Sequence, residues 1–164
     1  MNKLVRPHDT ATETHTAIAR QLLADATARL LDPLGTLFDP AIIEPLRRQL
    51  RGDSEMWAAQ VTGPDERLAG VTARRIIAAI YSDGGIFAPP RGWWQSPFGA
   101  LVARRFGHPT ADVVSLSVAS AMLGITRQGA HDLLKRGKLR RDGEDGGILV
   151  SSVQDRLSVP VSPR

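Results

Sequence analysis

Apolar residues recur at helical spacing in the first part of the chain. Between residues 11 and 31 they fall at positions 18, 22, 23, 26 and 30, which places them on one face of an α-helix. We expect this helix to end at Asp32-Pro33, because a residue that precedes proline is disfavoured in helical geometry. The pattern therefore predicts an amphipathic helix that buries one face against a partner element.

Two further helices are predicted by the same pattern and by their start signals. Asp39-Pro40 is an N-cap followed by proline at the first helical position, and we expect the helix that follows to end at Gly52. Asp65 begins another amphipathic helix, which the sequence Asp83-Gly84-Gly85 ends. The first 88 residues are thus expected to form a helical domain.

A Gly- and Pro-rich stretch, SDGGIFAPPRGWWQS at residues 82–96, predicts a linker. Ser96-Pro97 then begins a short helix that Gly107 closes, so that residues 89–112 are read as linker and short helix. We interpret Trp93 and Trp94 as buried packing anchors, with base stacking as the alternative.

Residues 117–141, SVASAMLGITRQGAHDLLKRGKLRR, contain two short apolar-faced segments separated by Gly-Ile-Thr. Ser117 and Thr126 are suitable N-caps, and Gly124 allows the chain to turn with positive φ between the two helices. Gly137 stands where glycine most often ends a helix. Two helices joined by a short turn that contains glycine indicate a helix-turn-helix.

The outward face of the second predicted helix carries long polar side chains. At 3.6 residues per turn, Arg127, Gln128, His131 and Lys135 project from one side, where Arg favours guanine and Gln favours adenine in a major groove. Arg136 and Lys138, near the helix end, are better placed for phosphates.

A hairpin wing is predicted after this helix. Residues 139–141 and the β-prone residues 148–150 are expected to form two short strands on either side of a Gly-rich tip, and Ser151 or Ser152 is expected to cap a final helix. The tip is acidic, with Asp142, Glu144 and Asp145. We therefore expect the basic residues at the start of the wing, rather than its tip, to approach DNA. The complete set of predicted DNA-binding residues is Thr126, Arg127, Gln128, His131, Lys135, Arg136, Lys138, Arg140 and Arg141.

The distribution of charge supports a polyanionic partner. The net charge is +4, yet residues 1–90 hold ten Lys/Arg against eleven Asp/Glu, whereas residues 91–164 hold eleven against six. Within residues 127–141, six basic side chains accompany only Asp132. The chain has no cysteine and no apolar run of membrane-spanning length, so a cytoplasmic protein without membrane contact is expected.

The run SVASAMLGITRQGAHDLLKRGKLRR, with ILVSSVQDRL after it, resembles the winged helix-turn-helix of excisionase-type and MerR-type DNA-binding domains. The matching positions are Ser117, Val118, Leu123, Gly124, Ile125, Thr126, Arg127, Gly137 and Leu139. The resemblance implies binding to double-stranded DNA and a role in transcription or in site-specific recombination. Ser120 stands where the family usually has alanine, and Gly129 lies inside the recognition helix. Residues 93–109 also resemble a stretch of actinobacterial proteins that carry this domain at the C-terminus.

We therefore expect a mainly α protein, in which residues 113–158 form the winged helix-turn-helix and residues 159–164 a tail. A sequence-specific transcriptional regulator is the preferred interpretation. The alternatives are a recombination directionality factor and a structural or protein-binding module. Homodimerisation through the N-terminal helices is expected, because a single small module has limited affinity for DNA. The histidines are scattered and no catalytic or cofactor motif occurs, so no enzymatic activity, cofactor or metal is expected.

Overall fold

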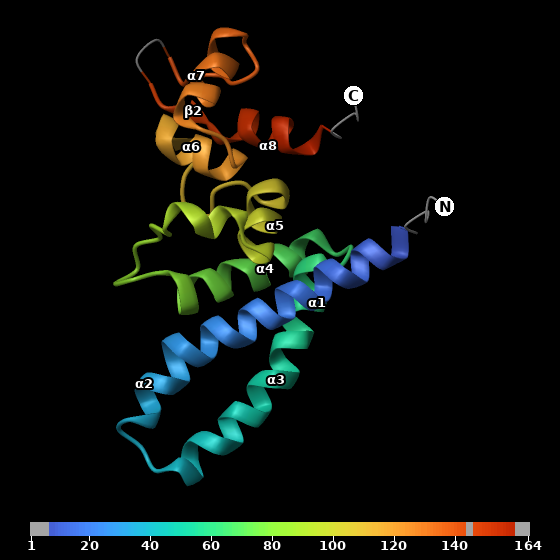
Figure 1. The fold of residues 1–164 in the computed structure, drawn as a ribbon, viewed down its shortest axis with the longest axis vertical. Coiled ribbons are helices and arrows are strands. Elements are labelled where there is room, and N and C mark those ends of the chain that lie inside the picture. Colours follow the sequence, from blue (N-terminus) through green and yellow to red (C-terminus); the bar gives the residue numbers. More distant parts are fainter. Residues whose placement is uncertain (1–6, 144–145, 160–164) are drawn as a thin grey trace. The chain divides into compact units, whose positions relative to one another are not determined.

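The structure is a computed structural model that describes residues 7–143 and 146–159 (Figure 1). It is mainly helical, with a small two-stranded antiparallel sheet. The chain divides into two compact units, residues 1–82 and 83–164. Residues 89–112, predicted as linker and short helix, belong to the second unit, and only Val159 of the predicted tail lies among the described residues.

The N-terminal unit is built on two long helices, α1 and α3, which pack against each other and run in opposite directions (Figure 1). Helix α4 packs on α3. The core consists of apolar side chains on the facing sides of these helices, among them Ile18, Leu22 and Val61. The elements of this unit are α1 (Pro7–Ala26), the π-helical turn η1 (Thr27–Leu31), α2 (Asp32–Gly35), α3 (Pro40–Thr62), α4 (Glu66–Ile76) and the π-helical turn η2 (Ile77–Tyr81).

The first helix does not end at Asp32-Pro33, so this prediction was wrong. Asp32 keeps helical dihedral angles, φ −64° and ψ −45°, and its N–H donates to the Thr27 carbonyl, five residues earlier. Helical structure then continues to Gly35. Leu31 is buried immediately before this point, and the Asp32 carboxylate accepts from Arg47 of α3 at 2.8 Å, so tertiary contacts hold Asp32 in helical geometry against the local preference before a proline.

Gly52 does not end the second helix either. Helix α3 continues to Thr62, and its buried face runs through Leu50, Ser54 and Ala58. Gly52 lies on the exposed side, where an added Cβ would meet no heavy atom within 4 Å. The cost of glycine in a helix is about 1 kcal/mol, which burial of the opposite face readily exceeds.

The predicted start signals are confirmed. The Asp39 carboxylate accepts from the Ala41 N–H at 2.8 Å, and the Asp65 carboxylate accepts from the Leu68 N–H at 2.9 Å. Both are N-cap hydrogen bonds that satisfy amide donors which the first helical turn leaves unpaired.

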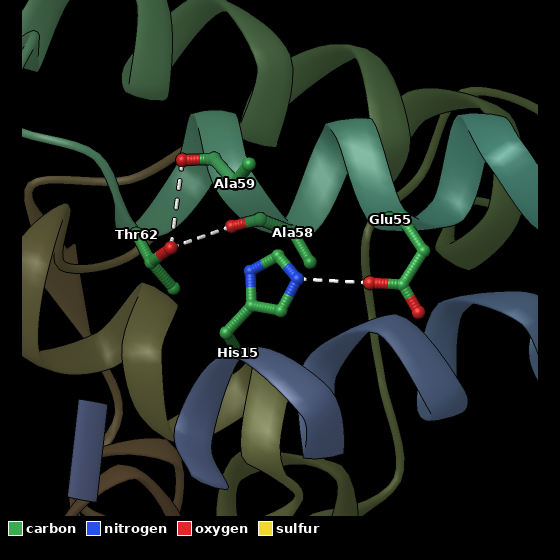
Figure 2. Close-up of polar contacts among 5 residues, drawn as sticks. All are labelled: His15, Glu55, Ala58, Ala59 and Thr62. Atoms are coloured by element: carbon green, nitrogen blue, oxygen red, sulfur yellow. Dashed lines mark hydrogen bonds and ion pairs between the residues drawn. The ribbon is translucent and has the colours of Figure 1, made fainter. Parts of the chain in front are cut away.

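Polar side chains connect the helices of this unit at two places. Figure 2 shows His15 of α1 facing Glu55 of α3, with Nε2 and Oε2 2.9 Å apart. The Tyr81 hydroxyl of η2 donates to Asp25 of α1 at 2.6 Å. Burial and this hydrogen bond raise the pKa of Tyr81 far above its usual value, so Tyr81 remains a neutral donor.

The C-terminal unit has a core of aromatic and aliphatic side chains. Trp93 and Trp94 are buried, which confirms them as packing anchors, and their rings meet edge to face with centroids 5.0 Å apart. Phe87 and Phe98 complete the cluster around Trp93. The elements of this unit are the 3₁₀-helix η3 (Arg91–Gln95), α5 (Pro97–Arg105), β1 (Val113–Val114), α6 (Leu116–Leu123), α7 (Arg127–Lys135), β2 (Ile148–Leu149) and α8 (Val150–Ser158).

The predicted hairpin is part of a slightly larger arrangement. Strand β2 pairs antiparallel with β1, in register Val113 with Leu149 and Val114 with Ile148. On its other side, Ile148 forms an isolated bridge with Arg141, and the Leu149 N–H donates to the Arg140 carbonyl at 2.9 Å. Strand β1 was not predicted, because two valines are too short a run to show alternation. Of the acidic tip, Glu144 and Asp145 lie outside the described residues.

Candidate nucleic-acid interface

Helices α6 and α7 meet at a turn of three residues, Gly124 to Thr126. Gly124 ends α6 in the left-handed conformation, with φ +67° and ψ +27°. The Thr126 hydroxyl caps α7 by accepting from the Gly129 N–H at 3.0 Å. Both of these roles were predicted and are confirmed. The predicted cap of α6 was wrong, because Ser115 rather than Ser117 accepts from the Val118 N–H, at 3.2 Å.

The turn is held by side chains of η3, from the segment that was predicted as a linker. Arg91 donates to the Ser120 hydroxyl at 3.0 Å and also to the Ile125 carbonyl. Gln95 donates to the Ala121 carbonyl at 2.8 Å. Ser120 stands where the DNA-binding family that this stretch resembles usually has alanine, and its hydroxyl therefore has a hydrogen-bond donor in Arg91. No sequence signal marks Arg91 or Gln95, because their contacts lie about 30 positions ahead in the chain.

The predicted contact edge of α7 is largely accessible. Arg127, Gln128 and Lys135 are exposed and His131 is half-buried, while Ala130 on the opposite side is fully buried. The Gln128 amide donates to Asp132 one turn ahead, at 3.1 Å. An added Cβ at position 129 would lie 3.3 Å from the Thr126 Oγ1 and in ordinary van der Waals contact, 3.7 Å, with the Ile125 Cβ.

Exposed cations continue past the end of α7. Gly137, with φ +67°, ends the helix as predicted, and the Lys138 N–H donates back to the Leu133 carbonyl at 2.9 Å. Arg136 and Lys138 are exposed on either side of it. Four of the predicted lysine and arginine contacts have neither a side-chain hydrogen bond nor an ion pair within the described part of the chain: Arg127, Lys135, Arg136 and Lys138.

The two predicted arginines of the wing are already engaged. Arg140 forms an ion pair with Asp155 of α8 at 3.1 Å, and both side chains are more than half exposed. Arg141 donates to the Gly146 carbonyl at 3.0 Å. An exposed ion pair of this kind is worth at most about 1 kcal/mol, so a phosphate could replace Asp155 as the partner of Arg140.

Ser152 connects Arg140 to α8 instead of capping that helix as predicted. Helix α8 begins at Val150 without a side-chain cap. The fully buried Ser152 hydroxyl accepts from the Arg140 N–H at 3.1 Å and donates to the Leu149 carbonyl at 2.7 Å. One hydroxyl of the last helix therefore bonds to both Arg140 and Leu149, which lie on the two sides of the predicted hairpin.

Substituting Ser152 with alanine is expected to destabilise the C-terminal unit by about 1–2 kcal/mol, because the Arg140 N–H loses its acceptor. Urea denaturation followed by tryptophan fluorescence measures the change. The matched control is Ser151→Ala, an exposed position in the same helix, which is expected to change stability by less than about 0.5 kcal/mol. Equal effects of the two substitutions would contradict the role assigned to Ser152.

Within residues 7–143 and 146–159, no group of three or more histidine, aspartate or glutamate side chains is placed to hold a metal ion. Every helix in these residues is too short or too polar to traverse a bilayer. The chain matches no protein-family model, no curated protein and no solved structure.

Proposed function

We propose that the C-terminal unit binds double-stranded DNA with α7 in the major groove, and that the protein is a transcriptional regulator. The observation that carries this proposal is the exposed polar edge of α7. The start of this helix is capped by Thr126, and the turn before it is held by Arg91 and Gln95 of η3. A helix presented in this manner is the element that enters the groove in helix-turn-helix proteins.

The positions along α7 suggest a division of roles. Arg127 and Gln128 lie at the N-terminal end, which reaches deepest into the groove in this docking geometry, and both side chains can form bidentate contacts to bases. His131 and Lys135 extend the same edge. Arg136 and Lys138, just beyond the helix, would contact phosphates, as would Arg140 and Arg141 at the base of the wing. Because the Thr126 hydroxyl already caps the helix, its main role is to fix the position of α7.

The charge of these residues supports a polyanionic partner. Lys135 and Arg136 also stabilise the negative end of the α7 dipole, and this alone would explain two cations. It does not explain Arg127, which lies at the positive end of the helix, where a cation is unfavourable. Contact with DNA accounts for Arg127 as well as for the unpaired cations after the helix.

The salt dependence of binding tests the proposal. For the full-length chain and a random-sequence duplex, log K is expected to fall steeply with log salt concentration, because each phosphate contact contributes about 0.9 to the slope. The variant Arg136→Ala/Lys138→Ala is expected to lower the magnitude of the slope by about 2. Fluorescence anisotropy of a labelled duplex, measured over a series of salt concentrations, gives the slope.

The matched control is Arg74→Ala/Arg75→Ala, which removes two exposed cations from α4 in the N-terminal unit. It has the same change in net charge and is expected to leave the slope unchanged. A flat wild-type slope would overturn the proposal and favour a protein-binding module. An equal loss of slope in the control variant would show that binding follows net charge rather than the α7 surface.

A further inference from the structure

The N-terminal unit contains a hollow with a volume of about 150 Å³, enclosed by η1, α3, α4 and η2. One wall is the face of the helical run α4–η2 that carries Thr72, Ile76 and Ile80 at intervals of one turn. Trp57 of α3 and Leu30 of η1 form the other walls. A protein cavity of about 150 Å³ lined by leucine, isoleucine and phenylalanine binds benzene, so this hollow has room for an apolar body the size of one six-membered ring.

Hydrogen bonds join the walls of the hollow to one another. The Thr72 hydroxyl donates to the Gln60 side chain of α3 at 2.8 Å, which connects α4 to α3. The Arg29 guanidinium of η1 donates to the Ile80 carbonyl of η2 at 3.3 Å, which connects the two π-helical turns. The hollow is therefore formed without a ligand, as most small-molecule sites are.

Both π-helical turns of the N-terminal unit contribute to the hollow. Leu30 lies on η1, and Ala79 and Ile80 lie on η2. Turns of this kind are rare inside helices, and they occur frequently at functional sites. Their meeting at one hollow favours a binding site over an incidental gap in the packing.

The polar groups available in the hollow are hydrogen-bond donors. Arg75 is an exposed lining residue, and within the described residues its guanidinium has no hydrogen bond or ion pair. Trp57 is half-buried, and its indole N–H has no acceptor in the same part of the chain. None of the described residues that line the hollow is acidic. Such a lining is complementary to an anion with an apolar body.

The helix dipole does not account for Arg75. A cation stabilises the last turn of a helix, and Arg75 lies in the last turn of α4. However, α4 continues directly into η2, so that the helical run ends at Tyr81, more than one turn beyond Arg75. Its place in the lining of the hollow gives this cation a partner that the dipole does not.

We propose that the hollow binds a small monocarboxylic acid whose apolar part is about the size of one ring. The apolar part would lie against Trp57, Ile76 and Ile80, and the Arg75 guanidinium would pair with the carboxylate. The inference goes beyond the proposed function and does not rest on it, because every lining residue belongs to the N-terminal unit.

Titration of the full-length chain with benzoate tests the site by NMR of the indole N–H groups. Trp57 is the one tryptophan of the N-terminal unit, and the signal that disappears in Trp57→Phe identifies it. Benzoate is expected to shift this signal with a dissociation constant of about 1 mM or below and to leave the other two indole signals in place. Benzamide, which has the same shape without the charge, should bind about fivefold more weakly or worse. No shift with benzoate, or equal affinities for the two compounds, would overturn the proposal.

Two pairs of variants test the position of the ligand. Arg75→Gln is expected to weaken benzoate binding about fivefold, because it removes the charge that pairs with the carboxylate. Ala79→Leu, which places a larger side chain in the hollow, should abolish the shift. The matched controls Arg74→Gln and Ala78→Leu lie outside the lining and should bind benzoate as the wild type does.

All four positions are exposed, so circular dichroism should show an unchanged fold. Wild-type affinity in Ala79→Leu, or an equal loss in either variant and its control, would contradict the site.

The carboxylate-binding and DNA-binding proposals can fail separately. Arg136→Ala/Lys138→Ala should bind benzoate as the wild type does, because both cations lie in the other unit. Arg74→Ala/Arg75→Ala should show the reverse, with weakened benzoate binding and an unchanged salt slope for DNA in the absence of benzoate. Benzoate binding without a salt-dependent affinity for DNA would leave the hollow as a ligand site and remove only the proposed function.

Discussion

Replacing Gly99 with alanine is expected to destabilise the C-terminal unit by about 3 kcal/mol, the largest effect expected of any substitution considered for this protein. An added Cβ would lie 2.0 Å from the Trp93 carbonyl oxygen and 2.8 Å from its carbon. Both are backbone atoms, so no side-chain rotation can relieve the clash. Either α5 or η3 would have to move. The higher helix propensity of alanine, about 1 kcal/mol over glycine, offsets only part of that cost.

Neither element can move freely. The Ser96 hydroxyl accepts from the Gly99 N–H at 3.1 Å and donates to the Trp93 carbonyl at 2.6 Å, which fixes η3 against the start of α5. Arg91 and Gln95 in turn attach η3 to α6 and to the turn before α7. The clash therefore acts on the whole unit, and affinity for DNA should fall along with stability.

Urea denaturation followed by tryptophan fluorescence measures this change, because Trp93 and Trp94 lie in the C-terminal unit and Trp57 in the N-terminal unit. The matched control is Gly52→Ala, the same substitution at a helical position where an added Cβ meets nothing within 4 Å. It should stabilise the N-terminal unit by about 0.5–1 kcal/mol. An unfolding midpoint of Gly99→Ala at the same urea concentration as the wild type would contradict the close approach of α5 to Trp93.

Substituting Gly124 with alanine is expected to cost about 2–3 kcal/mol. A residue with a Cβ pays roughly 1–2 kcal/mol in the left-handed conformation, and Gly124 has φ +67°. The new Cβ would also lie 2.6 Å from the Gln95 Oε1. Moving the Gln95 amide would break its hydrogen bond to the Ala121 carbonyl, which is worth about 1 kcal/mol.

A double-mutant cycle with Gln95→Ala separates the two contributions. Without the Gln95 amide, Gly124→Ala should cost only the conformational part, so the cycle should show a coupling of about 1 kcal/mol. Additive effects would mean that Gln95 does not contact the turn. Since Gly124 sets the direction of α7, the single variant should also bind a random duplex more weakly than the wild type, as fluorescence anisotropy would measure.

Several local features of the fold followed from the sequence. The caps at Asp39, Asp65 and Thr126 and the glycines at 124 and 137 were predicted, because each depends on the chemistry of one residue and its immediate neighbours. The outward edge of α7 was predicted from helical periodicity alone, and the structure leaves Arg127, Gln128 and Lys135 exposed as that periodicity requires.

Other features were missed because distant parts of the chain decide them. Helix α3 continues past Gly52 because its buried face extends across that position, and at Pro33 the contact of Asp32 with Arg47 of α3 accompanies the continued helix. Ser151 or Ser152 was expected to cap a helix, yet the Ser152 hydroxyl accepts from the Arg140 N–H, which lies beside it in the fold.

The sequence by itself determined where α3, α4, α5 and α7 begin, where the chain turns at Gly124 and Gly137, and which side of α7 is polar and basic. Only the tertiary structure decided that residues 83–112 are part of the C-terminal unit, with Arg91 and Gln95 holding the turn before α7. The reason is physical: caps and turns are short-range hydrogen bonds and backbone preferences, whereas these side chains find their acceptors only after the aromatic core has brought η3 to α6.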